Sequence, residues 1–83
     1  MNRQHVLDLI VQHAREVVPF LEAHAFTPTD SLRELGANSI DRSEILLMTM
    51  EALNLRIPLV QLAPAKNIGE LADLICQKGA QVA

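Results

Sequence analysis

Apolar residues recur every three or four positions along the N-terminal part of the chain. This spacing places them on one face of an amphipathic helix. The apolar positions are Val6, Leu7, Ile10, Val11, Ala14, Val17, Val18 and Leu21. Asn2 can cap the helix at its start. Pro19 would remove a backbone hydrogen bond inside a helix, so we expect the helix to end near Val18, or to kink there and run on to about Ala23.

A loop broken by glycine leads into the second predicted helix. Gly36 tolerates left-handed backbone angles and so permits a sharp turn, and Asn38 is among the best N-cap residues. Asp41 forms a shorter version of the capping box with Asn38, and Asp41 and Glu44 place negative charge at the positive end of the helix dipole. These signals predict a helix that begins at Ser39 or Ile40 and runs to about Leu53.

The second predicted helix is apolar on more than one side. Its core candidates follow one line at four-residue spacing, with two neighbours beside that line: Ile45, Leu46, Thr49, Met50 and Leu53. Ile40 and Leu47 lie on another face. They are either further core residues or an exposed apolar surface for a partner protein. The second interpretation would explain why a helix in so small a protein is apolar on several sides.

A long connection from about residue 24 to residue 38 precedes the second helix. Leu32 and Leu35 can pin it to the core. Ser31 and Glu34 form a Ser-x-x-Glu capping box, which is typical of the start of a helical turn. A loop of this length in so small a domain is either functional or carries a short helical turn.

The C-terminal part of the chain is divided by prolines and caps. Pro58 cannot continue the second helix, and residues 59–63, between two prolines, are expected to form a short helical turn. Asn67 opens a final helix that should end at the Lys78-Gly79 pair, and residues 80–83 should fray. No strand pattern is present, so the sequence predicts an all-α fold with three main helices and one short one.

The chain of 83 residues is expected to form one domain, over residues 1–83, that is too small to shape a deep catalytic pocket. Hydrophobic residues make up 49% of it, with no Trp or Tyr, so the core must be built from aliphatic residues together with Phe20 and Phe26. This composition favours helices over strands. Cys76 is the only cysteine, and we expect it to act as a small buried hydrophobic residue.

The formal net charge is −3, and acidic residues gather around the second helix. They are Asp30, Glu34, Asp41, Glu44 and Glu51, against the cations Arg33 and Arg42. Two interpretations stay open: an acidic docking face for basic partner enzymes, or a solvated helix face. Nucleic-acid binding is disfavoured because the chain has neither a basic stripe nor an aromatic stacking platform.

The histidines do not share the spacing of a helical metal pair, so we expect His5, His13 and His24 to be solvated surface residues rather than metal ligands. The start of the chain lacks the apolar core of a secretory signal. No apolar run is long enough to span a bilayer. We therefore expect a cytoplasmic protein with no membrane partner.

Ser39 lies at the predicted start of the second helix, where its hydroxyl is beside N–H groups that lack helical partners. Such a position receives a phosphate group well. The run Leu35-Gly36-x-Asn38-Ser39-Ile40 resembles the acyl carrier protein family. The resemblance implies a four-helix bundle and a covalent 4′-phosphopantetheine arm on Ser39, added from coenzyme A by a phosphopantetheinyl transferase.

Two details bear on this resemblance. The usual family tripeptide is Asp-Ser-Leu, where this chain has Asn38-Ser39-Ile40, and asparagine keeps the capping oxygen. Asp30-Ser31-Leu32 copies the tripeptide, but only Ser39 follows Leu-Gly and precedes a long amphipathic segment, so Ser39 is the preferred attachment residue. The pair Ile57-Pro58 stands at the distance from Ser39 that is expected of carrier proteins.

Residues 36–44 look most like the discrete donor carriers of bacterial polyketide β-branching. That resemblance implies a monomeric carrier, not an enzyme, which delivers acetyl to an enzyme similar to hydroxymethylglutaryl-CoA (HMG-CoA) synthase. It also implies an acyltransferase and a ketosynthase that decarboxylates malonyl to acetyl. The residues it implies for partner recognition are Asn38, Ile40, Asp41, Arg42, Glu44, Leu47 and Glu51.

Other functions stay open. The chain could serve a fatty acid-type pathway, or act as an unmodified helical adaptor that binds a partner through Ile40 and Leu47. A serine hydrolase is disfavoured because no histidine has an evident route to the Ser39 hydroxyl and no nucleophile elbow is present. A peptidyl carrier is disfavoured because that class usually has Gly-Gly, where this chain has Gly36-Ala37.

Overall fold

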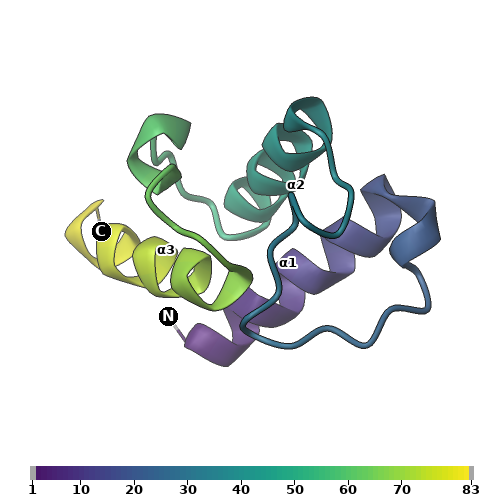
Figure 1. Cartoon of the computed structure of the whole chain (residues 1–83). Coiled ribbons are helices and arrows are strands. Elements are labelled where there is room, and N and C mark those ends of the chain that lie inside the picture. The colour runs from purple at the N-terminus through teal and green to yellow at the C-terminus, as the bar shows by residue number, and fades with distance from the viewer. Residues whose placement is uncertain (1, 83) are drawn as a thin grey trace.

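The computed structural model describes the chain from residue 2 to residue 82, with side chains described up to residue 79. These residues form three α-helices and two short 3₁₀ helices (Figure 1). The elements are α1 (Arg3–Val17), η1 (Pro19–Leu21), α2 (Ser39–Ala52), η2 (Leu59–Leu62) and α3 (Ile68–Val82). No strand occurs in the described part of the chain, so the all-α prediction is confirmed, and the short helix expected after Pro58 is the 3₁₀ helix η2.

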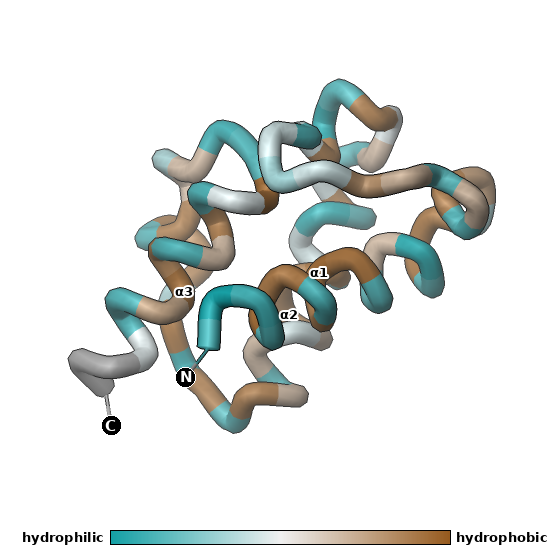
Figure 2. Tube along the Cα trace, turned by 90° about the horizontal axis from the view of Figure 1, so that it is seen from below, coloured by the Kyte–Doolittle hydropathy of each residue, from teal (hydrophilic) through white to brown (hydrophobic). Residues whose placement is uncertain are grey.

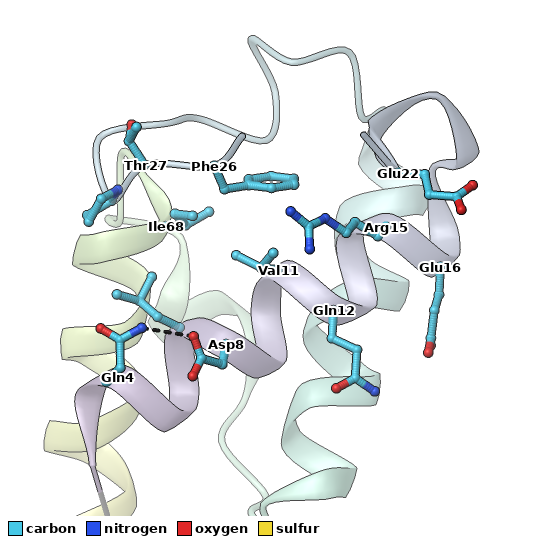
Figure 3. Close-up of a pocket in the computed structure, with 12 residues that line it drawn as sticks. Gln4, Asp8, Val11, Gln12, Arg15, Glu16, Glu22, Phe26, Thr27 and Ile68 are labelled. Carbon is cyan, nitrogen blue, oxygen red and sulfur yellow. Dashed lines mark hydrogen bonds between the residues drawn. The ribbon is translucent and has the colours of Figure 1, made fainter. Parts of the chain in front are cut away.

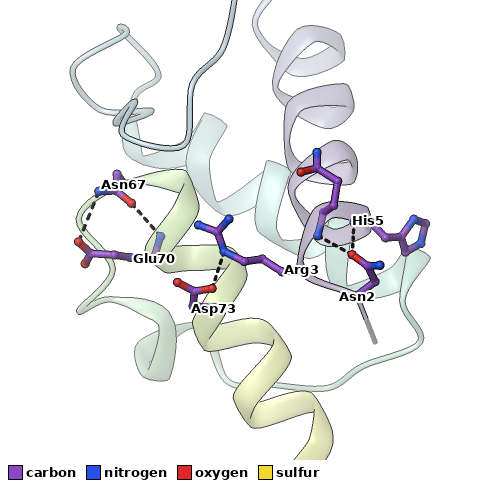
Figure 4. Close-up of polar contacts among 7 residues, drawn as sticks. Asn2, Arg3, His5, Asn67, Glu70 and Asp73 are labelled. Atoms are coloured by element: carbon purple, nitrogen blue, oxygen red, sulfur yellow. Dashed lines mark hydrogen bonds and ion pairs between the residues drawn. The ribbon is translucent and has the colours of Figure 1, made fainter.

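The α1 helix begins and ends where its cap and its proline predict. The Asn2 side-chain oxygen accepts hydrogen bonds from the backbone N–H groups of Gln4 (2.7 Å) and His5 (3.4 Å), as Figure 4 shows. Val18 is extended, and Pro19 then opens η1. The chain therefore stops its first helix before the proline and continues as a 3₁₀ turn, because proline cannot donate the backbone hydrogen bond that an α-helix needs.

The core is centred on α1, which packs against both α2 and α3, while α2 and α3 have few direct contacts with each other. Figure 2 shows hydrophobic and hydrophilic residues interspersed along the helices. The most completely buried side chains are Val6, Ile10, Ile45, Thr49, Ile68 and Ile75. Cys76 is half-buried and packs against this core.

Two predictions about single side chains are wrong. His13 is buried, not solvated, because it lies on the side of α1 that faces α2 and finds a partner there. The Thr49 hydroxyl donates to the carbonyl oxygen of Ile45 (2.8 Å), so it accepts from Nδ1 of His13 (2.8 Å). This bond removes the main cost of burying the imidazole. Phe20 is 68% exposed instead of joining the core, because η1 turns its neighbours Val18 and Leu21 inward and Phe20 outward.

The predicted end of α2 is confirmed, whereas the predicted end of the final helix is wrong. The α2 helix ends as predicted: Asn54 adopts a left-handed φ of 55°, and the N–H of Leu55 bonds to the carbonyl of Met50 in a Schellman motif. The final helix does not end at Gly79 but runs on to Val82. Glycine costs only about 1 kcal/mol inside a helix, and packing can offset this cost. The predicted fraying is also wrong for residues 80–82, which continue the helix, and residue 83 lies outside the described part.

The connection between η1 and α2 is fixed onto the start of α3. The carbonyl oxygens of Asp30 and Pro28 accept hydrogen bonds from the N–H groups of Ile68 (2.9 Å) and Gly69 (2.8 Å). Gly69 is required there, since a Cβ at this position would lie 2.8 Å from the Pro28 carbonyl oxygen. These contacts hold a long, irregular segment against the bundle.

The Asp30 carboxylate makes contacts within the same segment. It accepts a hydrogen bond from the Thr27 N–H (2.9 Å) and contacts Nε2 of His24 (3.0 Å). The Thr27 hydrogen bond, and then the His24 contact, hold the pKa of Asp30 below its usual value. Asp30 is therefore turned toward its own loop.

Polar contacts also link the ends of the bundle. Nε of Arg3 and the Asp73 carboxylate form an ion pair of 2.6 Å between α1 and α3 (Figure 4). Both side chains are about half exposed, so this pair adds little to stability. The N–H of Glu70 bonds to the Asn67 side-chain oxygen (2.7 Å), which confirms the predicted cap of α3.

Candidate attachment site at the start of α2

A single helical turn delivers the chain to α2. Its start is capped by Ser31, whose hydroxyl accepts from the N–H of Glu34 (3.3 Å). Its end is a Schellman motif, in which the N–H of Ala37 bonds to the carbonyl of Leu32 (3.0 Å) and Gly36 has a φ of +103°. The helical turn predicted in the connection is therefore present, and Ser31 serves as its cap.

A capping box fixes the first residue of α2. The Asn38 side-chain oxygen accepts from the N–H of Asp41 (2.8 Å), and the Asp41 carboxylate accepts from the N–H of Asn38 (3.4 Å). Nη1 of Arg42 donates to the Ala37 carbonyl (2.7 Å), which braces the turn before the cap. Ser39 is thus the first residue of a firmly held helix, and its side chain is exposed.

The N–H groups at this helix end are available to a ligand. Within residues 2–82, the N–H groups of Ser39 and Ile40 make no hydrogen bond, whereas those of Asp41 and Arg42 bond to Asn38. Unpaired N–H groups and the positive end of the helix dipole together attract an anion. A phosphodiester on the Ser39 hydroxyl would lie beside both groups, so the residues present fit a phosphate-linked group.

Ser39 also borders a hollow of about 680 Å³ between α2, η2 and the start of α3. Its apolar lining includes Leu46, Leu59, Leu62 and Leu71. Its charged lining consists of Arg33, Arg42 and Lys66 together with Glu34. A serine that opens onto a partly apolar hollow can carry a flexible group that also finds shelter there. The lining of the hollow comes from α2, η2, the start of α3 and the helical turn at residues 31–34.

A second hollow, of about 810 Å³, lies between α1 and the connection (Figure 3). Ser39 does not line it. The guanidinium of Arg15 sits 5.5 Å from the centre of the Phe26 ring and donates to the His24 carbonyl (3.0 Å). Arg15 is thereby used to hold the connection, and this hollow brings none of the predicted site residues together.

The residues predicted for partner recognition fall into two groups. Ile40 and Leu47 are 75% and 57% exposed, so the interpretation as further core is wrong and an apolar surface is present. Glu44 and Glu51 are also exposed. Asn38, Asp41 and Arg42 instead make the internal contacts that hold the helix start.

The geometry does not resemble a hydrolytic site. Ring nitrogens of His13 and His24 bond to Thr49 and Asp30, not to Ser39. Among the described residues, no group of three histidine, cysteine, aspartate or glutamate side chains could hold a metal ion. Within the same residues, no helix has the length and apolar character needed to cross a membrane.

The structure is a small helical bundle with an exposed serine at an open helix end beside a partly apolar hollow, an arrangement that suits a protein displaying an attached group. Comparison with known proteins agrees. The family model described as "Phosphopantetheine attachment site" matches residues 8–75. The chain is 45% identical over 78 residues to the polyketide biosynthesis acyl-carrier-protein AcpK of Bacillus subtilis (strain 168), covering 94% of this chain and 95% of AcpK.

The chain therefore belongs to the phosphopantetheine-binding acyl carrier protein family, whose members are carriers rather than enzymes and hold a covalent 4′-phosphopantetheine. A solved structure is similar as well. It is the crystal structure of the curacin biosynthetic pathway HMG synthase in complex with acetyl donor-ACP. The matched chain has 51% identity and a TM-score of 0.88, and the alignment covers 93% of this chain and 99% of that one.

Proposed function

We propose that Ser39 is the attachment residue for 4′-phosphopantetheine and that this chain is a donor carrier for polyketide β-branching. The observation that carries the first part is the exposed Ser39 beside two unpaired N–H groups. The second part is supported by the likeness to a chain solved with an HMG synthase. When bound, the arm supplies a terminal thiol that holds an acyl group, acetyl in this proposal, as a thioester.

The chain's own residues have three tasks in this function. The N–H groups of Ser39 and Ile40 stabilise the negative charge of the phosphodiester. The capping box of Asn38 and Asp41 keeps those groups aligned. The apolar side of the adjoining hollow gives the attached group a place to rest between enzymes. The carrier lowers no chemical barrier itself, but it raises the effective concentration of the acyl group at each partner's active site.

The partners of such a carrier are a phosphopantetheinyl transferase, an acyltransferase, a decarboxylating ketosynthase and an HMG-CoA synthase-like enzyme. The proposed recognition residues are Asn38, Ile40, Asp41, Arg42, Glu44, Leu47 and Glu51. Ile40 and Leu47 would contact partners directly, since both are exposed. We further propose that residues 1–83 act as one cytoplasmic, monomeric carrier domain and that η2 corresponds to the fourth, short helix of the carrier bundle.

Attachment is tested by intact mass after incubation with a broad-specificity phosphopantetheinyl transferase, Mg²⁺ and coenzyme A. The unchanged chain should gain one phosphopantetheine and Ser39→Ala none. Two matched controls are available: Ser31→Ala, which alters the other Asp-Ser-Leu sequence, and Ser43→Ala, which alters another serine lining the same hollow. Both should load fully. Loading of Ser39→Ala, or failure of the unchanged chain to load beside a carrier known to accept the arm, would reject the proposal.

The donor role is tested by acetyl transfer. Acetyl-loaded chain is mixed with the curacin pathway HMG synthase, and the acetyl group left on the arm is followed by mass spectrometry. We expect rapid loss of acetyl to the enzyme. Loss no faster than without enzyme, together with ready acceptance by fatty acid elongation enzymes, would instead favour a carrier for a fatty acid-type pathway.

A further inference from the structure

Phe20 is the feature that neither the core nor the attachment site explains. Its side chain is 68% exposed, although Val18, two residues before it, and Leu21, directly after it, are 3% and 4% exposed. Two anchored neighbours therefore hold the 3₁₀ helix in place and display the ring between them. The other phenylalanine, Phe26, is half-buried beside Arg15. Phe20 is thus the one strongly exposed aromatic side chain among the described residues.

The ring rests on the turn that leads to the attachment serine. A Cβ at Gly36 would lie 2.9 Å from Cζ and 3.4 Å from Cε2 of Phe20, so the ring occupies the space that glycine leaves free. Gly36 is three residues before Ser39, and three virtual bonds of about 3.8 Å place their Cα atoms at most about 11 Å apart. Figure 1 shows η1 beside the end of the connection, just before α2.

We infer that Phe20 is a docking residue, which contacts an apolar patch on the HMG synthase-type enzyme that takes acetyl from the carrier. This inference rests on the proposed function. An enzyme that draws the arm of Ser39 into its active site must bring its surface against the start of α2. On that approach it meets two exposed apolar side chains, Ile40 at the first turn of α2 and Phe20 on the adjacent turn.

Two further observations support an enzyme as the occupant. A chain with 51% identity and the same fold has been solved in complex with an HMG synthase, so a carrier of this fold does bind such an enzyme. Aromatic side chains are also the residues that most often dominate a protein interface, because they cover a large area and lose little conformational freedom. A ring held in place by Gly36 meets both conditions.

The test uses the curacin pathway HMG synthase and carriers driven to complete loading with excess transferase. Phe20→Ser should raise the KM of the acetyl-loaded carrier by about fivefold or more, the effect expected of a significant interface residue, and leave kcat within about twofold. Phe20→Leu should retain part of the affinity. The matched control is the same change at the other phenylalanine, Phe26→Leu, which should leave KM unchanged.

The possible outcomes separate docking from folding and from carrier function. An unchanged KM for Phe20→Ser would overturn the docking role. A fall in kcat together with a lower unfolding temperature for Phe20→Ser would also overturn it. That result would mean that the ring stabilises the turn at Gly36 and does not contact the enzyme. Failure of every chain to load, the unchanged one included, would overturn the proposed function and this inference with it.

Discussion

The starts of α2 and α3 look alike in sequence and differ in the folded protein. Each has an asparagine cap, Asn38 or Asn67, whose side chain binds the N–H three residues on. At α3 the first two N–H groups after the cap, those of Ile68 and Gly69, donate to carbonyl oxygens of the connection. At α2 the corresponding groups make no hydrogen bond among the described residues. The two helix ends thus share a motif, but only one can receive an anion.

This difference shows that a cap motif marks a helix start and does not by itself mark a site. The α3 start is closed by residues 28–30, which lie about forty positions away in the chain. Closure needs a glycine at position 69, where the connection approaches the backbone. The serine-bearing end stays open because the turn before it runs directly into its own cap, and within residues 2–82 no carbonyl oxygen of another segment accepts from its first two N–H groups.

Breaking the closure of α3 should have the largest effect on stability. In Gly69→Ala the new methyl would lie 2.8 Å from the Pro28 carbonyl oxygen, so the connection must move. We expect a loss of about 1–3 kcal/mol in the free energy of unfolding, measured by urea titration. Loading of Ser39 should persist, since its helix end does not use this contact. An unchanged unfolding free energy would show that the connection is not held as described.

Removing the two caps one at a time sharpens the comparison. Asn38→Ala and Asn67→Ala should each lower the free energy of unfolding by about 1 kcal/mol, because each leaves an N–H without its side-chain partner. Only Asn38→Ala should slow phosphopantetheine transfer, because only that cap aligns the N–H groups beside Ser39. The rates are compared by intact mass at short times. Equal rates for both variants would mean that the α2 cap contributes to folding alone.

The smallest expected effect concerns pH and belongs to the α3 side. The Thr27 N–H and then His24 lower the pKa of Asp30 from its usual value of 3.8. A carboxylate with a lowered folded-state pKa contributes stability that is present above its unfolded pKa, about 3.9, and lost as the pH falls through the folded-state pKa. We expect the unfolding free energy to fall less steeply below about pH 4 in Asp30→Asn than in the unchanged chain.

The measurement is urea unfolding of both chains at a series of pH values from about 2 to 6. Ser39 loading at neutral pH serves as the control, because Asp30 lies outside that site. Identical pH dependence in the two chains would contradict a role for the Asp30 carboxylate in holding the connection.

Local signals made most of the helix boundaries predictable. Asn2, Asn38 and Pro58 act within a few residues of themselves, so their effects can be inferred from the sequence. The place of Ser39 at the start of α2 followed from the same reasoning. Exposure of Ile40 and Leu47 also follows from their place on a face away from the core line, but periodicity alone left two interpretations open.

The remaining features depend on contacts between distant segments. His13 is buried because α2 supplies Thr49 as its partner, which is 36 residues away. Phe20 projects out of η1, and its ring contacts Gly36, 16 residues along the chain, rather than the core. The end of the final helix passes Gly79 because a glycine ends a helix only where the backbone takes up left-handed angles, and Gly36 is the one glycine with positive φ among the described residues.

The central position of α1 has a mechanical consequence. The α2 and α3 helices each pack against α1 and have few direct contacts with each other, so α1 is the main connection between them. The hollow beside Ser39 is lined by residues of α2, α3 and η2, among others. A small rotation of α2 or α3 on α1 would change the width of that space without having to break an interface between α2 and α3. The width of this hollow is therefore not fixed by a direct interface between α2 and α3.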